Sequence, residues 1–179
     1  MNQTALRDIT LGQMLDEAIA AHPDNDAVVY VDRDFRMTYQ EFGRLVDQIA
    51  KGLMALGVQK GEKVAIWATN VPHWVALQFA TAKIGAILLT VNTHYKESEL
   101  AYLLEQSETE NLVLIDGFRD ADYVQILYSL IPELKTQQRG HLVCSKFPCL
   151  KRVIFLGQEK HRGMVSMPEL LALNRLVSD

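Results

Sequence analysis

The sequence contains none of the short motifs that most often mark a nucleotide-binding or catalytic loop. It has no G-x-G-x-x-G after a predicted strand and no G-x-x-x-x-G-K-[ST] phosphate loop. It also has no G-x-S-x-G nucleophile elbow and no H-E-x-x-H metal-binding helix. The ten glycines are scattered at positions typical of helix ends and turns. No phosphate-binding loop is therefore visible in the sequence.

The chain also has few cysteines and no excess of positive charge. The two cysteines, Cys144 and Cys149, indicate a reducing compartment rather than a disulfide framework. A net charge of −4 and a pI near 5.7 provide no basic surface for nucleic acid, so we expect no nucleic-acid partner. Residues 1–10 lack the apolar core of a signal peptide. We therefore expect a cytoplasmic protein.

The apolar stretch over residues 63–91 allows two interpretations. It is long enough to span a membrane and contains only two ionisable residues after Lys63. Pro72 and Gly85 would interrupt a single spanning helix, and Asn70 lies beside the proline. These helix-interrupting residues therefore favour a soluble βαβ unit without a transmembrane segment. In this unit a buried strand (63–69), a helix (73–84) and a second buried strand (86–91) follow one another.

The rest of the chain also alternates between helical and strand patterns. The N-terminal part predicts a helix over 11–21, a small hairpin from 27–31 and 35–37, and a helix from Thr38 to Gly57. Thr38 and Glu41 have the spacing of a capping box, as do Ser166 and Glu169. Further helices are expected at 97–106, 120–130 and 166–173, and further strands at 111–115 and 152–156.

These elements predict an α/β protein with a mostly parallel sheet flanked by helices on both faces. At 179 residues the chain is expected to form one domain. The irregular, polar stretch 136–148 is expected to be a mobile surface loop.

Three groups of residues are candidates for function. His141, Cys144, Cys149 and His161 are zinc-ligand types, but their spacing does not match a zinc knuckle, so we expect no metal site. Asn92 to Tyr95 follow a strand that we take to be central. Ligands bind outside the carboxyl ends of such strands, although this loop could also simply lead into the next helix. The aromatic residues Trp67, Trp74 and Phe79 are interpreted as core filling.

Several segments resemble adenylate-forming acyl-CoA synthetases in the same order and spacing. T-Y-Q-E-F at 38–42 is similar to the family's T-Y-x-E-L, and G-L-M-A-L-G-V-Q-K-G-E-K-V-A-I-W-A-T-N at 52–70 is similar to L-x-x-L-G-V-x-K-G-D-x-V-A-I-x-x-x-N. W-x-x-x-x-F-A at 74–80, K-I-G-A-I-L-L-T-V-N at 83–92 and E-L-A-Y-L-L-x-Q-S at 99–107 follow. N-T-H-Y-K-E-S-E-L at 92–100 is especially like fatty-acyl-CoA synthetases. The resemblance covers residues 11–173, nearly the whole chain.

The resemblance implies an enzyme that activates a carboxylic acid, here a fatty acid, with ATP and Mg²⁺. The acyl-adenylate would then pass its acyl group to the thiol of coenzyme A. The family's phosphate loop ending in P-K-G, its nucleotide motifs and its C-terminal domain have no counterpart here. We therefore expect residues 1–179 to be an incomplete N-terminal fragment of the large domain. No catalytic residue maps onto it, and no cofactor is expected to bind it.

Within the resemblance, His94 and Tyr95 are the candidate residues near the coenzyme A or acyl channel. The main alternative is a stand-alone, non-catalytic α/β module that binds a ligand or a protein. A further possibility is a homodimer, because an incomplete sheet would expose an edge strand.

Overall fold

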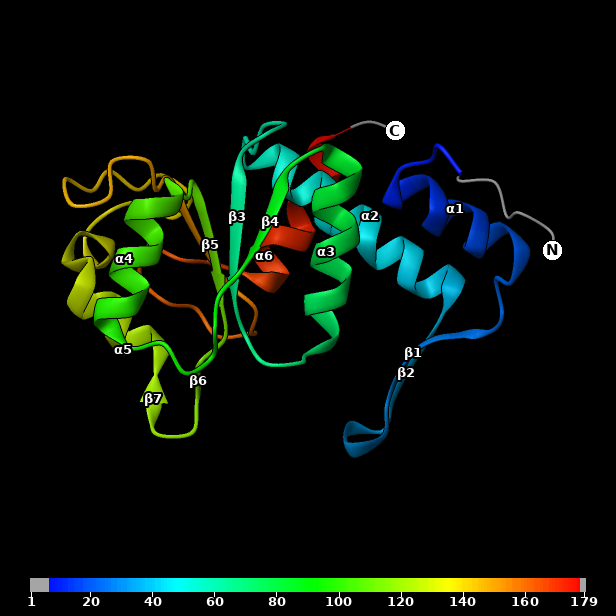
Figure 1. Ribbon diagram of the computed structural model, residues 1–179, viewed down its shortest axis with the longest axis horizontal. Coiled ribbons are helices and arrows are strands. Elements are labelled where there is room, and N and C mark those ends of the chain that lie inside the picture. The colour runs from blue at the N-terminus through cyan, green and yellow to red at the C-terminus, as the bar shows by residue number, and fades with distance from the viewer. Residues whose placement is uncertain (1–6, 178–179) are drawn as a thin grey trace, which may run out of the picture.

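A five-stranded parallel sheet forms the centre of the molecule (Figure 1). The computed structural model describes residues 7–177, apart from the side chain of Arg33. Residues 1–6 and 178–179 lie outside the described residues. The N-terminal stretch 1–10, which was expected to lack a signal peptide, is therefore described only from residue 7 onward. In spatial order the strands are β4 (Ile87–Thr90), β3 (Lys63–Trp67), β5 (Asn111–Leu114), β8 (Arg152–Phe155) and β9 (Val165–Ser166). All neighbouring pairs are parallel, which confirms the predicted α/β class.

The N-terminal segment consists of two helices and a hairpin. Helix α1 (Leu11–Ala21) precedes strands β1 (Asp26–Tyr30) and β2 (Phe35–Thr38), which are joined by the 3₁₀ turn η1 (Val31–Arg33), and helix α2 (Tyr39–Ala55) follows. The predicted capping box is present. The Glu41 N–H donates to the Thr38 hydroxyl at 3.2 Å, and the Thr38 N–H donates to the Glu41 carboxylate at 2.9 Å. The small antiparallel hairpin is likewise confirmed, and it projects from the body of the molecule in Figure 1.

Helices cover both faces of the sheet because side chains alternate along each strand. Along β3, Val64 and Ile66 enter a core shared with α1, α2, α3 (Pro72–Ile84) and α6 (Met167–Ala172). Ala65 and Trp67 enter a second core with α4 (Glu97–Ser107) and α5 (Tyr123–Leu130). Figure 1 shows α2, α3 and α6 on one side of the strands and α4 and α5 on the other. No helix within residues 7–177 combines the length and apolarity needed to cross a bilayer.

The second strand of the βαβ unit differs from its prediction. β4 was expected to be buried and central, but it is an edge strand, and Ile87 is 52% exposed. Its run of apolar residues predicted that helices would cover the strand on both faces. Such a run does not reveal whether a strand lies at the edge or in the centre of the sheet. The helix between the two strands ends as predicted at Gly85, which has φ +71° and closes α3 with its backbone N–H.

Four short elements, three strands and one 3₁₀ turn, were missed because two-residue strands and single turns leave no periodic pattern. β6 (Gly117–Phe118) and β7 (Ala121–Asp122) form a small hairpin, so the helix predicted from residue 120 begins at Tyr123. β9 adds a fifth strand beside β8. A 3₁₀ turn, η3 (Leu173–Leu176), follows α6, although no terminal element was expected.

The stretch 136–148 is irregular, as predicted, and follows the 3₁₀ turn η2 (Pro132–Lys135). The expectation that it is a polar surface loop is wrong at Leu142, Cys144 and Phe147, which are all buried in the second core. Arg139 also forms an ion pair with Glu169 at 2.7 Å. These contacts fix the course of the segment, whereas its mobility stays a prediction.

A buried ionic network joins the amino ends of the three central strands. Arg152, the first residue of β8, donates to the carbonyl oxygens of Leu56 and Gly57 at the end of α2, at 2.7 Å each. Its Nη1 donates to Glu62 and to Asn111, at 3.1 Å each. A cation at the carboxyl end of a helix also complements the helix dipole. Arg152 therefore fixes α2 relative to β3, β5 and β8.

Glu62 is the anionic partner in this network and is only 8% exposed. Its burial alone would raise the pKa of the carboxyl group. Hydrogen bonds from Lys151, Asn111 and the Gln59 N–H, together with the charge of Arg152, outweigh burial and hold the pKa of Glu62 below its ordinary value near 4.5. The folded state therefore favours the ionised form more than the unfolded state does. The resulting stability is present above about pH 4.5 and is lost as the pH falls through the folded pKa.

Replacing Glu62→Gln should therefore lower the free energy of unfolding by about 3 kcal/mol at pH 7, because Arg152 loses its buried counter-charge. The difference from the unmodified chain should shrink as the pH falls below about 4.5 and through the lowered pKa of folded Glu62. Urea denaturation at pH 7, 5 and 3.5 measures both effects. Asp26→Asn, which removes an exposed ion pair with Arg36, is the control and should cost less than about 1 kcal/mol. Equal losses in the two variants would contradict the role assigned to the network.

Candidate functional site

The strand order places the strongest candidate site between β3 and β5. The chain runs from β3 to β4 on one side and then returns to β5 on the other side of β3. Loops after β3 and β5 therefore leave the sheet in opposite directions and open a crevice at their carboxyl ends. This is the topological switch point, where ligands bind in open α/β sheets. The order β4-β3-β5-β8-β9 corresponds to the flavodoxin-like order 2-1-3-4-5.

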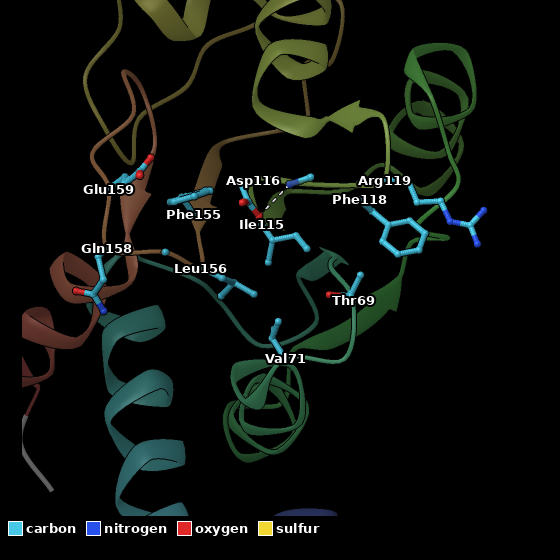
Figure 2. A pocket seen from close by; sticks show the side chains of 12 residues that line it. Thr69, Val71, Ile115, Asp116, Phe118, Arg119, Phe155, Leu156, Gln158 and Glu159 are labelled. Atoms are coloured by element: carbon cyan, nitrogen blue, oxygen red, sulfur yellow. Dashed lines mark hydrogen bonds between the residues drawn. The ribbon is translucent and has the colours of Figure 1, made fainter. Parts of the chain in front are cut away.

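A cavity of about 770 Å³ lies at this position (Figure 2). It lies at the carboxyl ends of the three central strands, with lining residues Thr69 and Val71 after β3, residues 115–119 after β5, and residues 155–159 at the end of β8. Figure 2 shows Val71, Ile115 and Leu156 converging on its floor. A cavity of this size is large enough for a small-molecule ligand.

The rim of the cavity is polar and carries both signs of charge. Asp116 and Glu159 contribute carboxylates, and Arg119 contributes a guanidinium group. The Gly117 N–H donates to the Asp116 carboxylate at 3.0 Å, which holds that side chain in place. Apolar floor and charged rim together suit a ligand with an apolar part and polar or charged groups.

A second cavity of about 290 Å³ continues along the same apolar wall. It shares Val71, Ile115 and Leu156 with the first cavity and extends to Phe35 of the hairpin and His73 of α3. Burial lowers the pKa of His73, so its imidazole is neutral at neutral pH. The apolar surface thus runs from the switch point toward the N-terminal hairpin.

The predicted loop, Asn92 to Tyr95, follows the edge strand β4 and does not line the main cavity. His94 is exposed, and its ring contacts Phe118 edge-on, with centroids 5.4 Å apart. Phe118 is itself a lining residue. Tyr95 instead packs partly against the second core. The structure therefore brings His94 to the cavity rim through Phe118 and leaves Tyr95 in a packing position.

Two stacked aromatic rings position this loop. Trp67 and Tyr123 lie face to face, with centroids 3.6 Å apart and an interplanar angle of 8°. The Trp67 indole N–H donates to the Asn92 carbonyl at 3.2 Å, and the Tyr123 hydroxyl donates to the Thr93 carbonyl at 2.6 Å. Burial raises the pKa of Tyr123 to about 12, so the hydroxyl remains a donor at neutral pH. Trp67 is fully buried, and Trp74 and Phe79 pack against the first core, which confirms the core-filling interpretation.

Two of the four zinc-type residues take part in core packing. Cys144 is buried in the second core, and the His161 ring packs edge-on against Phe155 with centroids 4.4 Å apart. In the described part of the chain, no three His, Cys, Asp or Glu side chains are placed to hold a metal ion.

Sequence reasoning missed Asp116, Arg119 and Glu159 as site residues. They follow strands that the sequence located correctly, since residues 111–115 and 152–156 were both predicted. The missing information was the order of the strands, because the rule for ligand sites applies to the switch point and not to every strand end. The Asp116-Gly117 pair at a strand end was the available signal.

Comparison with known proteins supports a specific family. The model of the family described as AMP-binding enzyme matches residues 15–166. YngI of Bacillus subtilis (strain 168), provisionally named an acyl-CoA synthetase, is 47% identical over 170 residues, covering 95% of this chain and 31% of YngI. The mitochondrial medium-chain acyl-CoA ligase ACSF2 of Danio rerio is 35% identical over 155 residues, covering 87% of this chain and 26% of ACSF2.

The fold agrees with this match. The N-terminal domain of FACL13 from Mycobacterium tuberculosis superposes with a TM-score of 0.70 at 22% identity, over 95% of this chain and 37% of that chain. A doubly wound α/β fold and a ligand-sized cavity at its switch point thus accompany the sequence match. The chain belongs to the AMP-binding enzyme family. It spans about a third or less of the length of the curated relatives it matches.

The variant Tyr123→Phe should loosen the 92–95 loop, because it removes the hydroxyl that holds the Thr93 carbonyl. We expect a loss of about 1 kcal/mol in the free energy of unfolding and faster hydrogen exchange of the His94 and Tyr95 amides. Tyr128→Phe removes a comparable hydrogen bond, to the Arg162 carbonyl at 3.0 Å, and serves as the matched control. Unchanged exchange in the loop of Tyr123→Phe would show that the ring stacking and the Trp67 hydrogen bond to Asn92 position it without the Tyr123 hydroxyl.

Proposed function

We propose that this chain is the N-terminal part of an AMP-forming ligase that joins a carboxylic acid to coenzyme A. The proposed acid substrate is a fatty acid. In the whole enzyme ATP would activate the acid as an acyl-adenylate with release of pyrophosphate, and coenzyme A would then accept the acyl group as a thioester. The family match over residues 15–166 is the observation that carries this proposal. The names of YngI and ACSF2 as acyl-CoA synthetase and ligase support the substrate class.

The residues described here would supply framework rather than chemistry. Mg²⁺ would accompany ATP in the whole enzyme, yet residues 7–177 contain no group of three carboxylate, histidine or cysteine side chains that could hold it. This chain would therefore take no part in binding the metal. Its contribution would be the sheet, the apolar cavity floor and the positioned loops at the carboxyl ends of the strands. We propose that these 179 residues alone are catalytically inactive.

A chimera tests both parts of this proposal. Residues 1–179 replace the aligned N-terminal third of YngI, and pyrophosphate release is measured with ATP, Mg²⁺, coenzyme A and a panel of fatty acids. We expect the chimera to release pyrophosphate and to form thioester, and the isolated chain to do neither. Unmodified YngI is the positive control. Activity of the isolated chain would refute its inactivity. A folded chimera without activity on any carboxylic acid would count against the ligase assignment.

We propose that the His94 loop borders the coenzyme A or acyl channel of the whole enzyme. Its support is the contact of His94 with Phe118 at the rim of the cavity. Tyr95 would act through packing, because it contacts the second core.

In the chimera, His94→Ala should lower kcat/KM for coenzyme A by about tenfold while leaving adenylate formation, measured by pyrophosphate exchange, unchanged. Tyr95→Phe should have a smaller effect, because it keeps the packed ring. Tyr102→Ala on α4, where the ring is 66% exposed, is the control. If His94→Ala and Tyr102→Ala have the same kinetics with coenzyme A and with every acid, the loop is purely structural.

The second candidate is a stand-alone, non-catalytic α/β module that binds a ligand or protein. The specific observation in its favour is that residues 69–159 form the 770 Å³ cavity without any other chain. The exposed edge strand β4 also provides a surface for a homodimer, which concentration-dependent sedimentation would detect. The sequence of the gene beyond codon 179 separates the two candidates, since a glycine- and threonine-rich loop ending in P-K-G belongs only to the ligase.

We propose a cytoplasmic location. The absence of a membrane-crossing helix within residues 7–177 is consistent with it. The name of the ACSF2 relative gives a mitochondrial location for that protein, so fractionation of cells that express the gene provides the test.

A further inference from the structure

Within residues 7–177, one buried side-chain nitrogen has no hydrogen-bond partner. It is Nε2 of His161, in the segment 157–163 that joins β8 to β9. Buried polar atoms are nearly always hydrogen-bonded, so an unpartnered one requires an explanation. The ring itself is fixed, because it packs edge-on against Phe155 with an interplanar angle of 83°. The missing partner therefore points to a second state of the segment, in which Nε2 is hydrogen-bonded.

A carboxylate close to this nitrogen can become its partner. Glu159 Oε2 lies 3.9 Å from His161 Nε2, which is too far for a hydrogen bond but close enough for an ion pair. The Glu159 side chain is 82% exposed, so it can turn toward the ring at little cost in packing. A protonated imidazole would make Nε2 a charged donor, and such a donor binds a carboxylate at about 2.8 Å.

The same carboxylate lines the cavity at the switch point. Gly157, Gln158 and Glu159 all contribute to the cavity lining, whereas His161 does not. Figure 2 shows Gln158 and Glu159 on the side of the cavity opposite Phe118. The segment that contains the unpartnered nitrogen is therefore also one wall of the cavity.

The backbone of this wall is held at its two ends. The Met167 N–H donates to the Gly157 carbonyl at 3.2 Å, and the Tyr128 hydroxyl donates to the Arg162 carbonyl at 3.0 Å. Between these anchors, residues 158–160 form no backbone hydrogen bond with the described part of the chain. A backbone without such bonds opens readily, so a new side-chain bond in this stretch would order it.

Histidine is the side-chain type that changes charge between pH 5 and 8, and the other groups around His161 keep theirs. Burial raises the pKa of Glu169 on α6, but hydrogen bonds from Ser166 and the charge of Arg139 outweigh burial and hold it below 4.5. Burial raises the pKa of Tyr128 on α5 above 10. The basic side chains from this segment and from the elements packed against it stay protonated in this range; they are Lys135, Arg139, Lys160 and Arg162.

We propose that His161 and Glu159 form a pH-sensitive latch on the cavity wall. On the acidic side of the His161 titration, the imidazolium binds the Glu159 carboxylate, orders residues 158–160 and draws the carboxylate away from the cavity. On the alkaline side the imidazole is neutral, and the bond is lost. The latch therefore adds stability at the lower pH and loses it as the pH rises through the titration. The inference concerns the isolated chain and does not rest on the ligase activity.

NMR of the isotope-labelled chain between pH 5 and 8 tests the latch. The carboxyl carbon of Glu159 and the amides of 158–160 should shift with the same midpoint as the His161 ring. Exchange of these amides, corrected for its intrinsic pH dependence, should slow about threefold on the acidic side. Glu159→Gln should lower the His161 midpoint by about half a pH unit, as expected for the loss of an exposed ion pair, and should abolish the slowing.

Two further variants separate the latch from general effects of charge. His161→Phe keeps a ring against Phe155 but removes the titrating group and the unpartnered nitrogen. It should raise the thermal midpoint at pH 8 and abolish the slowing of exchange on the acidic side. His141→Gln removes an exposed histidine from the preceding irregular segment and is the matched control. It should leave both the midpoint and the slowing unchanged.

Three results would overturn the proposal. They are slowing that persists in Glu159→Gln, slowing that is lost in His141→Gln, and a Glu159 carboxyl carbon that does not respond at the His161 midpoint. The third is measured on the unmodified chain, so the proposal stays testable even if His161→Phe fails to fold. None of these results bears on the YngI chimera, whose thioester assay tests the ligase assignment separately.

Discussion

The buried contact between Arg152 and the end of helix α2 is the constraint on which the rest of the structure depends. One guanidinium group satisfies two carbonyl oxygens of the helix end and binds the Glu62 carboxylate and the Asn111 side chain. Gly57 allows this approach, because a Cβ atom there would lie 3.0 Å from Arg152 Nη2. Such a buried pair adds stability only when its hydrogen bonds are satisfied, as they are here. The network thereby sets the relative position of α2 and the central strands.

The two ends of the sheet have different tasks. The amino ends carry the ionic network, and their polar groups are largely used within the fold. The carboxyl ends carry the cavity, where Arg119 keeps its donors exposed and Asp116 and Glu159 line the rim. The stacked pair Trp67 and Tyr123 reaches from the second core to the backbone of the 92–95 loop. The ionic network thus lies at the opposite end of the sheet from the candidate site, and the aromatic pair links the second core to the loop at the rim.

Much of the fold was predictable because it rests on local chemistry. The capping boxes at Thr38 and Ser166 appeared in the sequence as a hydroxyl and a glutamate three residues apart, and the structure contains both. Gly85 marked the end of α3 for a similarly local reason. The status of β4 was not predictable, because edge and central strands can carry the same apolar run. The burial of Leu142, Cys144 and Phe147 was also missed, because irregular backbone gives no period from which an inward face can be read.

The sequence by itself determined the α/β class, the positions of most helices and strands, and the resemblance to acyl-CoA synthetases, because these depend on periodicity and on residues near one another in the chain. Only the tertiary structure decided where the candidate site lies. Strand order is a long-range property, set by which strands pair after the chain crosses the sheet. The sequence had suggested the loop after β4, whereas the strand order places the candidate site in the crevice between β3 and β5. In the folded chain His94 and Arg119 both contact the ring of Phe118.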